Sequence, residues 1–287
     1  MTMGSHFSCM TCPGREAAPL FNAVPDYFLP TDIRVNYVRC SACGLVQQHP
    51  LPADVAPFYA GYPVHARKSV LHEITRRAVL RPVYFPLNKL HPDQVLLDYG
   101  CGDGWFLDQA KSRVAAAYGF EPVPAQAADV ARRIGIPVFH DPAALHAELV
   151  GRVDVITLHF VMEHLTDLRG TLAMLSALLK PGGILRAVVP NLDNLEYRWF
   201  GVRWHGFDAP RHISFPAPQH LGPMLCETGL VVTESHPVPF PNTMAASVCI
   251  ALTGRYRPLP FLALLPLALV WARLYPRGNR AMTLRKE

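Results

Sequence analysis

The stretch VLLDYGCGDGWFLDQA, residues 95–110, decides the fold of this 287-residue chain. Its apolar start indicates a buried strand, and a turn containing Gly100, Gly102 and Gly104 follows before Trp105 opens a helical pattern. Glycines lack Cβ atoms, so a ligand can lie against their backbone, while a helix N-terminus supplies unpaired N–H donors and partial positive charge. The stretch therefore predicts a ligand site at the carboxyl end of a strand in an α/β sheet.

The spacing of the glycines distinguishes between ligand classes. A dinucleotide site needs Gly-x-Gly-x-x-Gly, but Trp105 holds the sixth position, which argues against a nicotinamide-dependent oxidoreductase. No Lys-Ser/Thr pair follows the loop, so a nucleotide-triphosphate P-loop is excluded. The order of apolar strand, Asp98, one residue and Gly-x-Gly-x-Gly resembles the first motif of the class I S-adenosylmethionine-dependent methyltransferases. This resemblance implies a Rossmann-like α/β fold with a seven-stranded mixed sheet, and S-adenosylmethionine as cofactor.

A second acid should follow about 20 residues after the glycines, to bind the ribose hydroxyls. Glu121 fits, because it ends an expected strand at 115–120 and precedes an expected helix at 125–133. A solvated surface glutamate is the alternative. The strand, acid and helix context favours the binding role.

Further cofactor positions are implied at the ends of the next strands. Asp141 follows a third strand (136–139) and would bind the adenine amine by resemblance, although Pro142 after it makes a helix N-cap an equal alternative. His159 and Phe160 end a fourth strand (153–158), where the methionine and adenine portions would lie. The implied cofactor set is Asp98, Gly100, Cys101, Gly102, Gly104, Glu121, Asp141, His159 and Phe160.

The run from 159 to 183 is also similar to that family, with an exit loop, Glu-His-Leu, an amphipathic helix and Lys-Pro-Gly-Gly. Glu163 and His164 are expected to shape the loop rather than to do chemistry. The glycines at 182–183 should stop the helix, and a fifth strand should follow at 184–189.

Four of the seven cysteines form a metal-binding pattern, in which Cys9 and Cys12 make one C-x-x-C pair and Cys40 and Cys43 the other. Two such pairs favour a closed, structural Zn²⁺ site, and the intervening apolar residues should form a small core. Unrelated thiols or two disulfides are the alternatives. No charged-then-apolar secretory leader is visible, so reduced thiols and a cytoplasmic location are expected. The combination resembles a methyltransferase subgroup with an N-terminal zinc ribbon, many of whose members act on sugars or small metabolites.

The insertion after the fifth strand is where we expect the acceptor to bind. Its Asp-x-Pro-Arg-His run resembles a pattern seen in methyltransferases of this broad group. A hydroxyl or acidic-carbon acceptor needs a base, and histidine suits that role. His212 is the first candidate, His205 the second, and Asp208 the orienting partner. An equal alternative is that Arg211 and His212 only tie this loop to the sheet edge.

Residues 258–272, PLPFLALLPLALVWA, carry no charge but are shorter than the ~20 residues of a spanning helix. Pro260 and Pro266 are expected to interrupt any helix there. Flanking arginines and aromatics suit peripheral contact with the inner face of a membrane through 258–275, and a lipid-linked acceptor. A core helix or a homodimer contact is the equal alternative. By resemblance, a last strand at 279–286 would lie antiparallel between the fifth strand and a sixth strand expected at 230–235.

The whole chain is expected to divide into a zinc-ribbon-like module (1–60), a linking helix or lid (61–94) and a methyltransferase domain (95–287) with an apolar helical excursion at about 244–275. Its net charge of +5 is dispersed, without a basic stripe interleaved with aromatics, so nucleic acid is not an expected partner. The expected activity is methyl transfer to oxygen or carbon of a small-molecule, sugar or lipid-linked acceptor. A catalytically silent zinc and Rossmann-like module that docks a partner protein is the alternative. The sequence predicts no oligomeric state.

Overall fold

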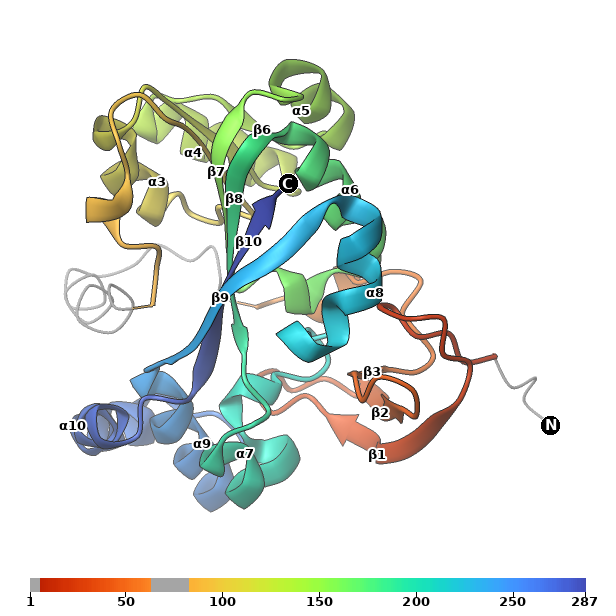
Figure 1. Ribbon diagram of the computed structural model, residues 1–287. Helices are drawn as coiled ribbons and strands as arrows, with labels where there is room; N and C mark the ends of the chain where they lie inside the picture. The colour runs from red at the N-terminus through yellow and green to blue at the C-terminus, as the bar shows by residue number, and fades with distance from the viewer. Residues whose placement is uncertain (1–5, 63–82) are drawn as a thin grey trace.

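Two β-sheets organise the chain in the computed structural model, which describes residues 6–62 and 83–287 (Figure 1). The large sheet has the strand order β6-β5-β4-β7-β8-β10-β9, and β10 pairs antiparallel with both of its neighbours. This confirms the seven-stranded mixed sheet and the place of the last strand. The large-sheet strands are β4 (Val95–Tyr99), β5 (Ala116–Phe120), β6 (Val138–Phe139), β7 (Val153–His159), β8 (Leu179–Pro190), β9 (Leu230–Val238) and β10 (Asn279–Lys286). The small sheet is β1 (Ala17–Pro25), β2 (Arg34–Cys40) and β3 (Val46–Gln48).

Helices cover both faces of the large sheet. In Figure 1, α3 (Trp105–Ala110) and α4 (Pro124–Ile134) lie on one side, and α6 (Leu168–Leu178) and α8 (Pro218–Thr228) on the other. The helix α5 (Pro142–Leu149) packs against α6. At one end of the sheet, α7 (Leu195–Phe200), α9 (Pro241–Thr253) and α10 (Pro258–Leu274) form a helical group. The short elements are α1 (Ala56–Tyr59) and the 3-10 helices η2 (Leu87–Lys89), η3 (Lys111–Arg113), η4 (Met162–His164), η5 (Gly201–Arg203) and η6 (His205–Phe207).

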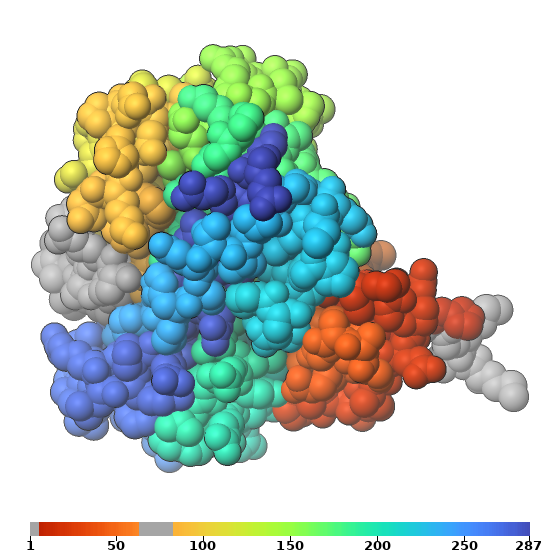
Figure 2. Space-filling view, in the orientation of Figure 1, coloured from red at the N-terminus to blue at the C-terminus, as the bar shows by residue number. Residues whose placement is uncertain are grey.

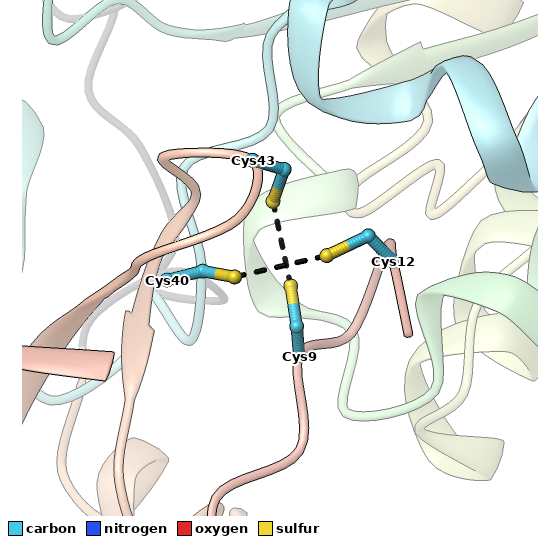
Figure 3. A group of neighbouring side chains, drawn as sticks. All are labelled: Cys9, Cys12, Cys40 and Cys43. Carbon is cyan, nitrogen blue, oxygen red and sulfur yellow. Dashed lines mark hydrogen bonds between the residues drawn. The ribbon is translucent and has the colours of Figure 1, made fainter. Parts of the chain in front are cut away.

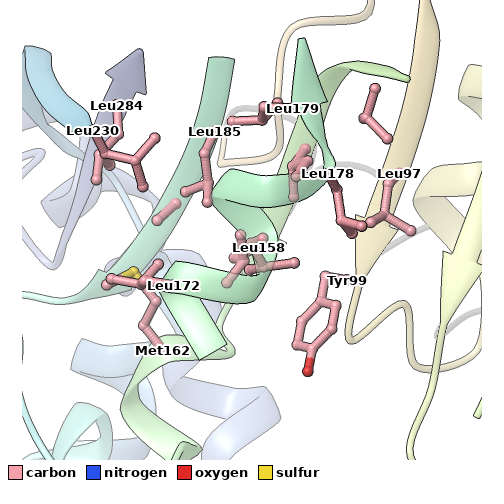
Figure 4. Close-up of a cluster of buried hydrophobic side chains, with 14 of the residues drawn as sticks. Leu97, Tyr99, Leu158, Met162, Leu172, Leu178, Leu179, Leu185, Leu230 and Leu284 are labelled. Atoms are coloured by element: carbon pink, nitrogen blue, oxygen red, sulfur yellow. The ribbon is translucent and has the colours of Figure 1, made fainter. Parts of the chain in front are cut away.

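A leucine-rich core fixes α6 on the sheet (Figure 4). Leu172 and Leu178 of α6 are fully buried with Leu158 of β7 and Leu185 of β8. Each such side chain stabilises the fold by about 1.5–3 kcal/mol through burial. The side chain of Asp167 caps the N-terminus of α6 by accepting a hydrogen bond from the main-chain N–H of Gly170.

The N-terminal module packs on the insertion through a shared core, beside a small buried cluster of its own around the four cysteines. Tyr37 of β2 is fully buried against Phe207 and Phe215 of the insertion, with ring centroids 4.6 and 6.0 Å away. Trp204 and Val46 of β3 belong to the same buried cluster. The expected small core is therefore shared with residues more than 150 positions away, and the module forms a lobe beside the insertion (Figure 2).

Two expected boundaries differ from the structure. Pro260 and Pro266 do not interrupt α10, which runs unbroken over 17 residues; Pro260 lies in the first turn, where no intrahelical N–H is needed. The glycines at 182–183 lie within β8, which starts at Leu179, because α6 has already ended at Leu178. The expected linking helix at about 70–80 lies outside the described residues. Within the described ranges, no helix is long and apolar enough to cross a membrane.

Candidate functional site

The three glycines of the loop after β4 have different surroundings. All three have positive φ, between 57° and 77°. A Cβ on Gly100 would lie 2.5 Å from Val161, and one on Gly104 2.6 Å from Val130, so close packing excludes larger side chains there. A Cβ on Gly102 would meet no described atom within 4 Å. Gly102 is thus the position at which a ligand can approach the main chain.

Glu121 lies against that same backbone. Its Oε2 accepts a hydrogen bond from the Gly102 N–H at 3.1 Å, and its Oε1 one from the Val123 N–H at 3.3 Å. Burial raises the pKa of this carboxyl, which is only 6 % exposed. The two elements meet because β4 and β5 are adjacent parallel strands, with Tyr99 opposite Phe120 at their carboxyl ends. A glycine cradle beside a ribose-binding acid is the arrangement that fits S-adenosylmethionine.

Asp98 and His159 lie at the ends of β4 and β7 and support the loop from below. Asp98 Oδ1 accepts a hydrogen bond from the Thr157 hydroxyl at 2.6 Å and lies 3.3 Å from His159 Nδ1. His159 Nε2 accepts from the Phe85 N–H at 3.0 Å, so a neutral ring carries its proton on Nδ1. The ring is buried between Tyr84 and Phe106, at centroid distances of 4.3 and 4.7 Å. The sequence predicted His159 here but not Tyr84, which no motif marks.

The segment that holds Tyr84 also lines a cavity of about 520 Å³ on the outer side of α3. Phe106 contributes to both the cavity and the contact with His159. The other lining residues are Phe85, Pro86, Leu87, Asn88, Trp105, Gln109 and Arg113.

The remaining implied cofactor residues have clear structural roles. Cys101 is buried, and its sulfur would lie 3.1 Å from a Cβ on Gly119. This close packing explains why a small side chain stands at position 101. Phe160 has a φ of 60°, and its ring lies 5.2 Å from Phe240. Both carboxylate oxygens of Asp141 cap α5 by accepting main-chain N–H groups, so the N-cap alternative describes the structure.

Cys9, Cys12, Cys40 and Cys43 bring their sulfur atoms together at one point, and we call them the four-cysteine cluster (Figure 3). The Sγ atoms of Cys9 and Cys43 are 3.5 Å apart, and those of Cys12 and Cys40 are 3.7 Å apart. A disulfide would need about 2.05 Å. Zn–S bonds of about 2.3 Å in a tetrahedron place the sulfurs about 3.8 Å apart. The cluster therefore fits a zinc module.

The N-terminal module is joined to the insertion by hydrogen bonds between main-chain groups. The Gln48 N–H donates to the Ile213 carbonyl at 2.8 Å, and the Phe215 N–H to the Val46 carbonyl at 3.0 Å. The Tyr37 hydroxyl donates to the His212 carbonyl at 2.8 Å. The segment 213–215, directly after His212, is thus paired with β3 through an isolated antiparallel bridge, and we call it the insertion strand.

Arg211 joins the same two parts of the chain through charge. Its side chain is fully buried, with Nη1 2.7 Å from Asp26 and Nη2 2.7 Å from Asp208. The Tyr62 ring lies 4.2 Å from the guanidinium. Burial alone would raise the pKa of Asp208, but the Arg211 charge outweighs it and lowers that pKa. Arg211 therefore joins the insertion to Asp26 of the N-terminal module rather than to the edge of the large sheet, and Asp208 pairs with Arg211 while lying 3.9 Å from His212 Nε2.

His205 adjoins this pairing, because its carbonyl accepts a hydrogen bond from the Asp208 N–H at 3.2 Å. Its main-chain N–H donates to the Ser247 hydroxyl at 2.8 Å, and its ring packs edge-on against Phe28 at 5.1 Å. Burial lowers the pKa of His205, so its ring is neutral near pH 7.

A second group of potential ligands was missed by the sequence reasoning. Glu163, His164 and His212 place one ligand atom each within 4.8 Å of one another, and we call them the Glu-His-His cluster. Glu163 is fully buried, and burial raises its pKa to about 8. The Nδ1 atoms of His164 and His212 lie 3.0 and 2.9 Å from the carbonyls of Arg211 and Gly206. A Glu-His pair directly after a strand end, with a histidine in the insertion, was the available signal.

Comparisons with known proteins agree with this arrangement. A methyltransferase-domain family model matches residues 68–235. A malonyl-[acyl-carrier protein] O-methyltransferase of Serratia marcescens is 26 % identical over 54 % of this chain, and a ubiquinone biosynthesis O-methyltransferase of Methylobacterium sp. (strain 4-46) is 25 % identical over 49 %. The match spans 61 % of the length of each of these relatives.

Among solved structures, one described as a sarcosine dimethylglycine methyltransferase from Galdieria sulphuraria superimposes with a TM-score of 0.50. The match has 15 % identity and covers 79 % of this chain and 91 % of that one. This likeness shows the fold, and the family model covers more than half of the chain. With the glycine cradle and its acid already in contact, the chain belongs to the S-adenosylmethionine-dependent methyltransferases of the methyltransferase-domain family.

Proposed function

We propose that this protein methylates an oxygen atom of a small-molecule or lipid-linked acceptor. The contact between Glu121 and the Gly102 N–H is the observation that supports S-adenosylmethionine as the methyl donor. The preference for oxygen over carbon is supported by two relatives that are named as O-methyltransferases. Bound S-adenosylmethionine supplies a methyl group already activated by its sulfonium charge.

The insertion supplies what the acceptor side needs. Trp204 and Phe207 are buried and help to exclude water from the layer between the module and the sheet. Burial, the largest influence, and the nearby His164 lower the pKa of His212 to about 3, so its ring is neutral near pH 7. Its Nδ1 donates to the Gly206 carbonyl, which leaves the lone pair on Nε2. A pKa this far below 7 makes Nε2 a weak proton acceptor, whereas its lone pair can still bind a cation.

Calorimetry with S-adenosylhomocysteine tests the donor site directly. Glu121→Gln removes the charge that we expect to bind the ribose, and a charge-assisted hydrogen bond of about 1.5–3 kcal/mol predicts a ~10- to 150-fold loss of affinity. Glu148→Gln, on exposed α5, is the matched control and should bind like the unchanged protein. Zinc-loaded protein that binds neither the nucleoside nor its methylated form would refute the proposal. Transfer of labelled methyl from the cofactor to metabolite and lipid extracts then identifies the acceptor.

We also propose that the four-cysteine cluster holds one structural Zn²⁺. The support is the pair of Sγ–Sγ distances, together with Gly14, where a Cβ would lie 2.9 Å from the Cys40 sulfur. Four thiolate ligands leave no open position for chemistry. Metal analysis should find one zinc per chain, and none per chain in a protein with Cys12→Ser and Cys40→Ser together.

Peripheral contact between α10 and a membrane is a separate proposal. Leu259, Leu267 and Leu274 are 80, 71 and 77 % exposed, while Leu265 and Ala268 on the opposite face are buried. That pattern argues against the core-helix alternative, because α10 uses one face for packing and presents the other outward. Exposed arginines lie at both ends of the helix, namely Arg255, Arg257, Arg273 and Arg277.

Liposome flotation tests the membrane contact. The protein should float with vesicles that contain anionic lipid, since apolar burial and basic residues act together at such a surface. Leu267→Glu and Leu274→Glu together should abolish flotation, whereas Glu substitution of exposed Val150, directly after α5, should leave it unchanged. Protein that stays with the buffer fraction at low salt would contradict this proposal.

A further inference from the structure

We propose that the Glu-His-His cluster is a second metal site, which binds one divalent first-row transition cation through Glu163, His164 and His212. The three residues come from η4, directly after β7, and from the position directly before the insertion strand. One ligand atom of each lies within 4.8 Å of the others. Two histidines and one carboxylate with remaining open positions are a donor set that Mn²⁺, Fe²⁺ and Zn²⁺ all accept.

The Glu163 carboxylate is the strongest indication of a ligand. The residue is 0 % exposed, and neither of its carboxylate oxygens has a hydrogen-bond partner among the described residues. Buried carboxyl groups are normally hydrogen-bonded, paired with a charge or bound to a metal. The adjacent backbone is engaged elsewhere, because the Glu163 carbonyl accepts from the N–H groups of Ile213 and Ser214. The side chain is therefore fixed in position while its two oxygens stay available.

The two histidines are held in the way that metal ligands usually are. Each places Nδ1 within 3.0 Å of a main-chain carbonyl, which leaves Nε2 unprotonated in the neutral ring. The Tyr59 hydroxyl lies 2.9 Å from the same Nδ1 of His164 and adds a second oxygen beside it. The rings of His164 and His212 are edge to face, with centroids 4.7 Å apart.

The neighbouring charges favour a cation over a bound anion. Asp208 Oδ2 lies 3.9 Å from His212 Nε2. The nearest guanidinium, that of Arg211, already pairs with Asp26 and Asp208 and so does not neutralise Glu163. A divalent cation would compensate the buried carboxylate without disturbing that pairing.

The site also lies where an acceptor must meet the donor. The strand β7 that leads into η4 is hydrogen-bonded to β4, whose carboxyl end carries the glycine loop. Val161, two residues before Glu163, packs against Gly100 of that loop, since a Cβ on Gly100 would lie 2.5 Å from its side chain. Resting on the proposed function, the cation would bind the acceptor hydroxyl and ease loss of its proton to water. The oxygen left behind would take the methyl group from the sulfonium, which becomes a neutral thioether.

Mn²⁺ is the probe, because thiolate clusters disfavour it and it therefore reports the Glu-His-His cluster alone. Titration of zinc-loaded full-length protein, followed by the electron paramagnetic resonance signal of free Mn²⁺, should show one equivalent bound. Glu163→Gln should weaken that binding by at least ~10-fold, since even outer-shell losses cost 10- to 100-fold. Glu196→Gln is the matched control, because that buried carboxylate accepts hydrogen bonds from the indoles of Trp204 and Trp271 instead.

Two further measurements keep the outcomes separate. Mn²⁺ should raise the melting temperature of the unchanged protein but not that of His164→Gln. This comparison does not require the Glu163 variant to be stable. Calorimetry with S-adenosylhomocysteine should give the same affinity for Glu163→Gln as for the unchanged protein. Zinc-loaded protein that binds the nucleoside but no Mn²⁺ overturns the metal site alone, with a protonated Glu163 as the reason. Protein that binds Mn²⁺ but no nucleoside overturns the proposed function and leaves the metal site standing.

Discussion

Arg211→Met should be among the most destabilising single changes in this chain. The Arg211 side chain is fully buried, and its two outer nitrogens each lie 2.7 Å from a carboxylate oxygen, of Asp26 on one side and Asp208 on the other. Those carboxylates are 1 and 8 % exposed, so water cannot replace the guanidinium. Methionine replaces the apolar part of the side chain but supplies neither the charge nor the hydrogen bonds of the guanidinium.

The expected loss follows from stranding a buried charge. Removing one partner of a buried ion pair costs about 3–5 kcal/mol, and two carboxylates are stranded here, which favours the upper end. In the unchanged protein the lowered pKa of Asp208 means that its stabilisation is present above the unfolded value of about 3.9 and is lost as the pH falls through the lower folded value. In Arg211→Met, burial acts without that opposing charge and raises the carboxyl pKa. Relative to the unchanged protein, in which the Asp208 contribution is constant over this range, the variant should therefore gain stability as the pH falls from 8 to 5.

Urea unfolding of zinc-loaded protein, followed by tryptophan fluorescence at pH 8 and pH 5, measures both effects. Arg152→Met is the control, because Arg152 pairs with Glu148 at the surface and should shift the free energy of unfolding by less than about 1 kcal/mol. The inferred strength of the buried pairing would be refuted if Arg211→Met lowered the free energy of unfolding by no more than this control does. It would also be refuted if the stability of Arg211→Met did not change with pH relative to that of the unchanged protein.

Three other outcomes are expected. Gly102→Ala should leave the melting temperature within a few degrees of that of the unchanged protein, but calorimetry should show no nucleoside binding. Gly104→Ala should lower the free energy of unfolding by about 1–3 kcal/mol, because its Cβ would lie 2.6 Å from Val130. Removing zinc with a chelator should raise hydrogen exchange in the insertion strand that pairs with β3 before it does so in the large sheet. Leu265→Ala should cost about 2–3 kcal/mol in denaturant unfolding, and Leu267→Ala, at a position 71 % exposed, less than about 0.5 kcal/mol.

Local features of the sequence predicted much of the large sheet. The glycine loop, Glu121 and the strand at 153–158 are each marked by apolar runs that end in polar or glycine residues, and β4, β5 and β7 follow them closely. The antiparallel β10 was expected only by resemblance. Its place between β8 and the edge strand β9 is visible in no periodicity, because the order of strands depends on pairings between distant segments.

Long-range contacts explain what the sequence reasoning missed. Tyr37 looked like part of a small module core, but its ring meets Phe207 and its hydroxyl meets the His212 carbonyl. Glu163 looked like a loop residue because nothing in its neighbourhood along the chain shows that β3 and the insertion bury it. Pro266 would break an isolated helix, yet packing of α10 against α9 outweighs the lost hydrogen bond.

The pairing of β3 with the strand at 213–215 has a consequence for how the chain acquires its structure. The two C-x-x-C pairs are close enough in sequence to assemble early, but the edge of β3 gains its partner only from a segment some 165 residues downstream. Closing so long a loop carries an entropic cost that grows only slowly with length, so the delay is a matter of rate more than of stability. Until then the exposed edge of β3 would be open to strands of other molecules. Grafting the ribbon onto another enzyme, or deleting it from this one, would accordingly leave two unsatisfied edges rather than two intact parts.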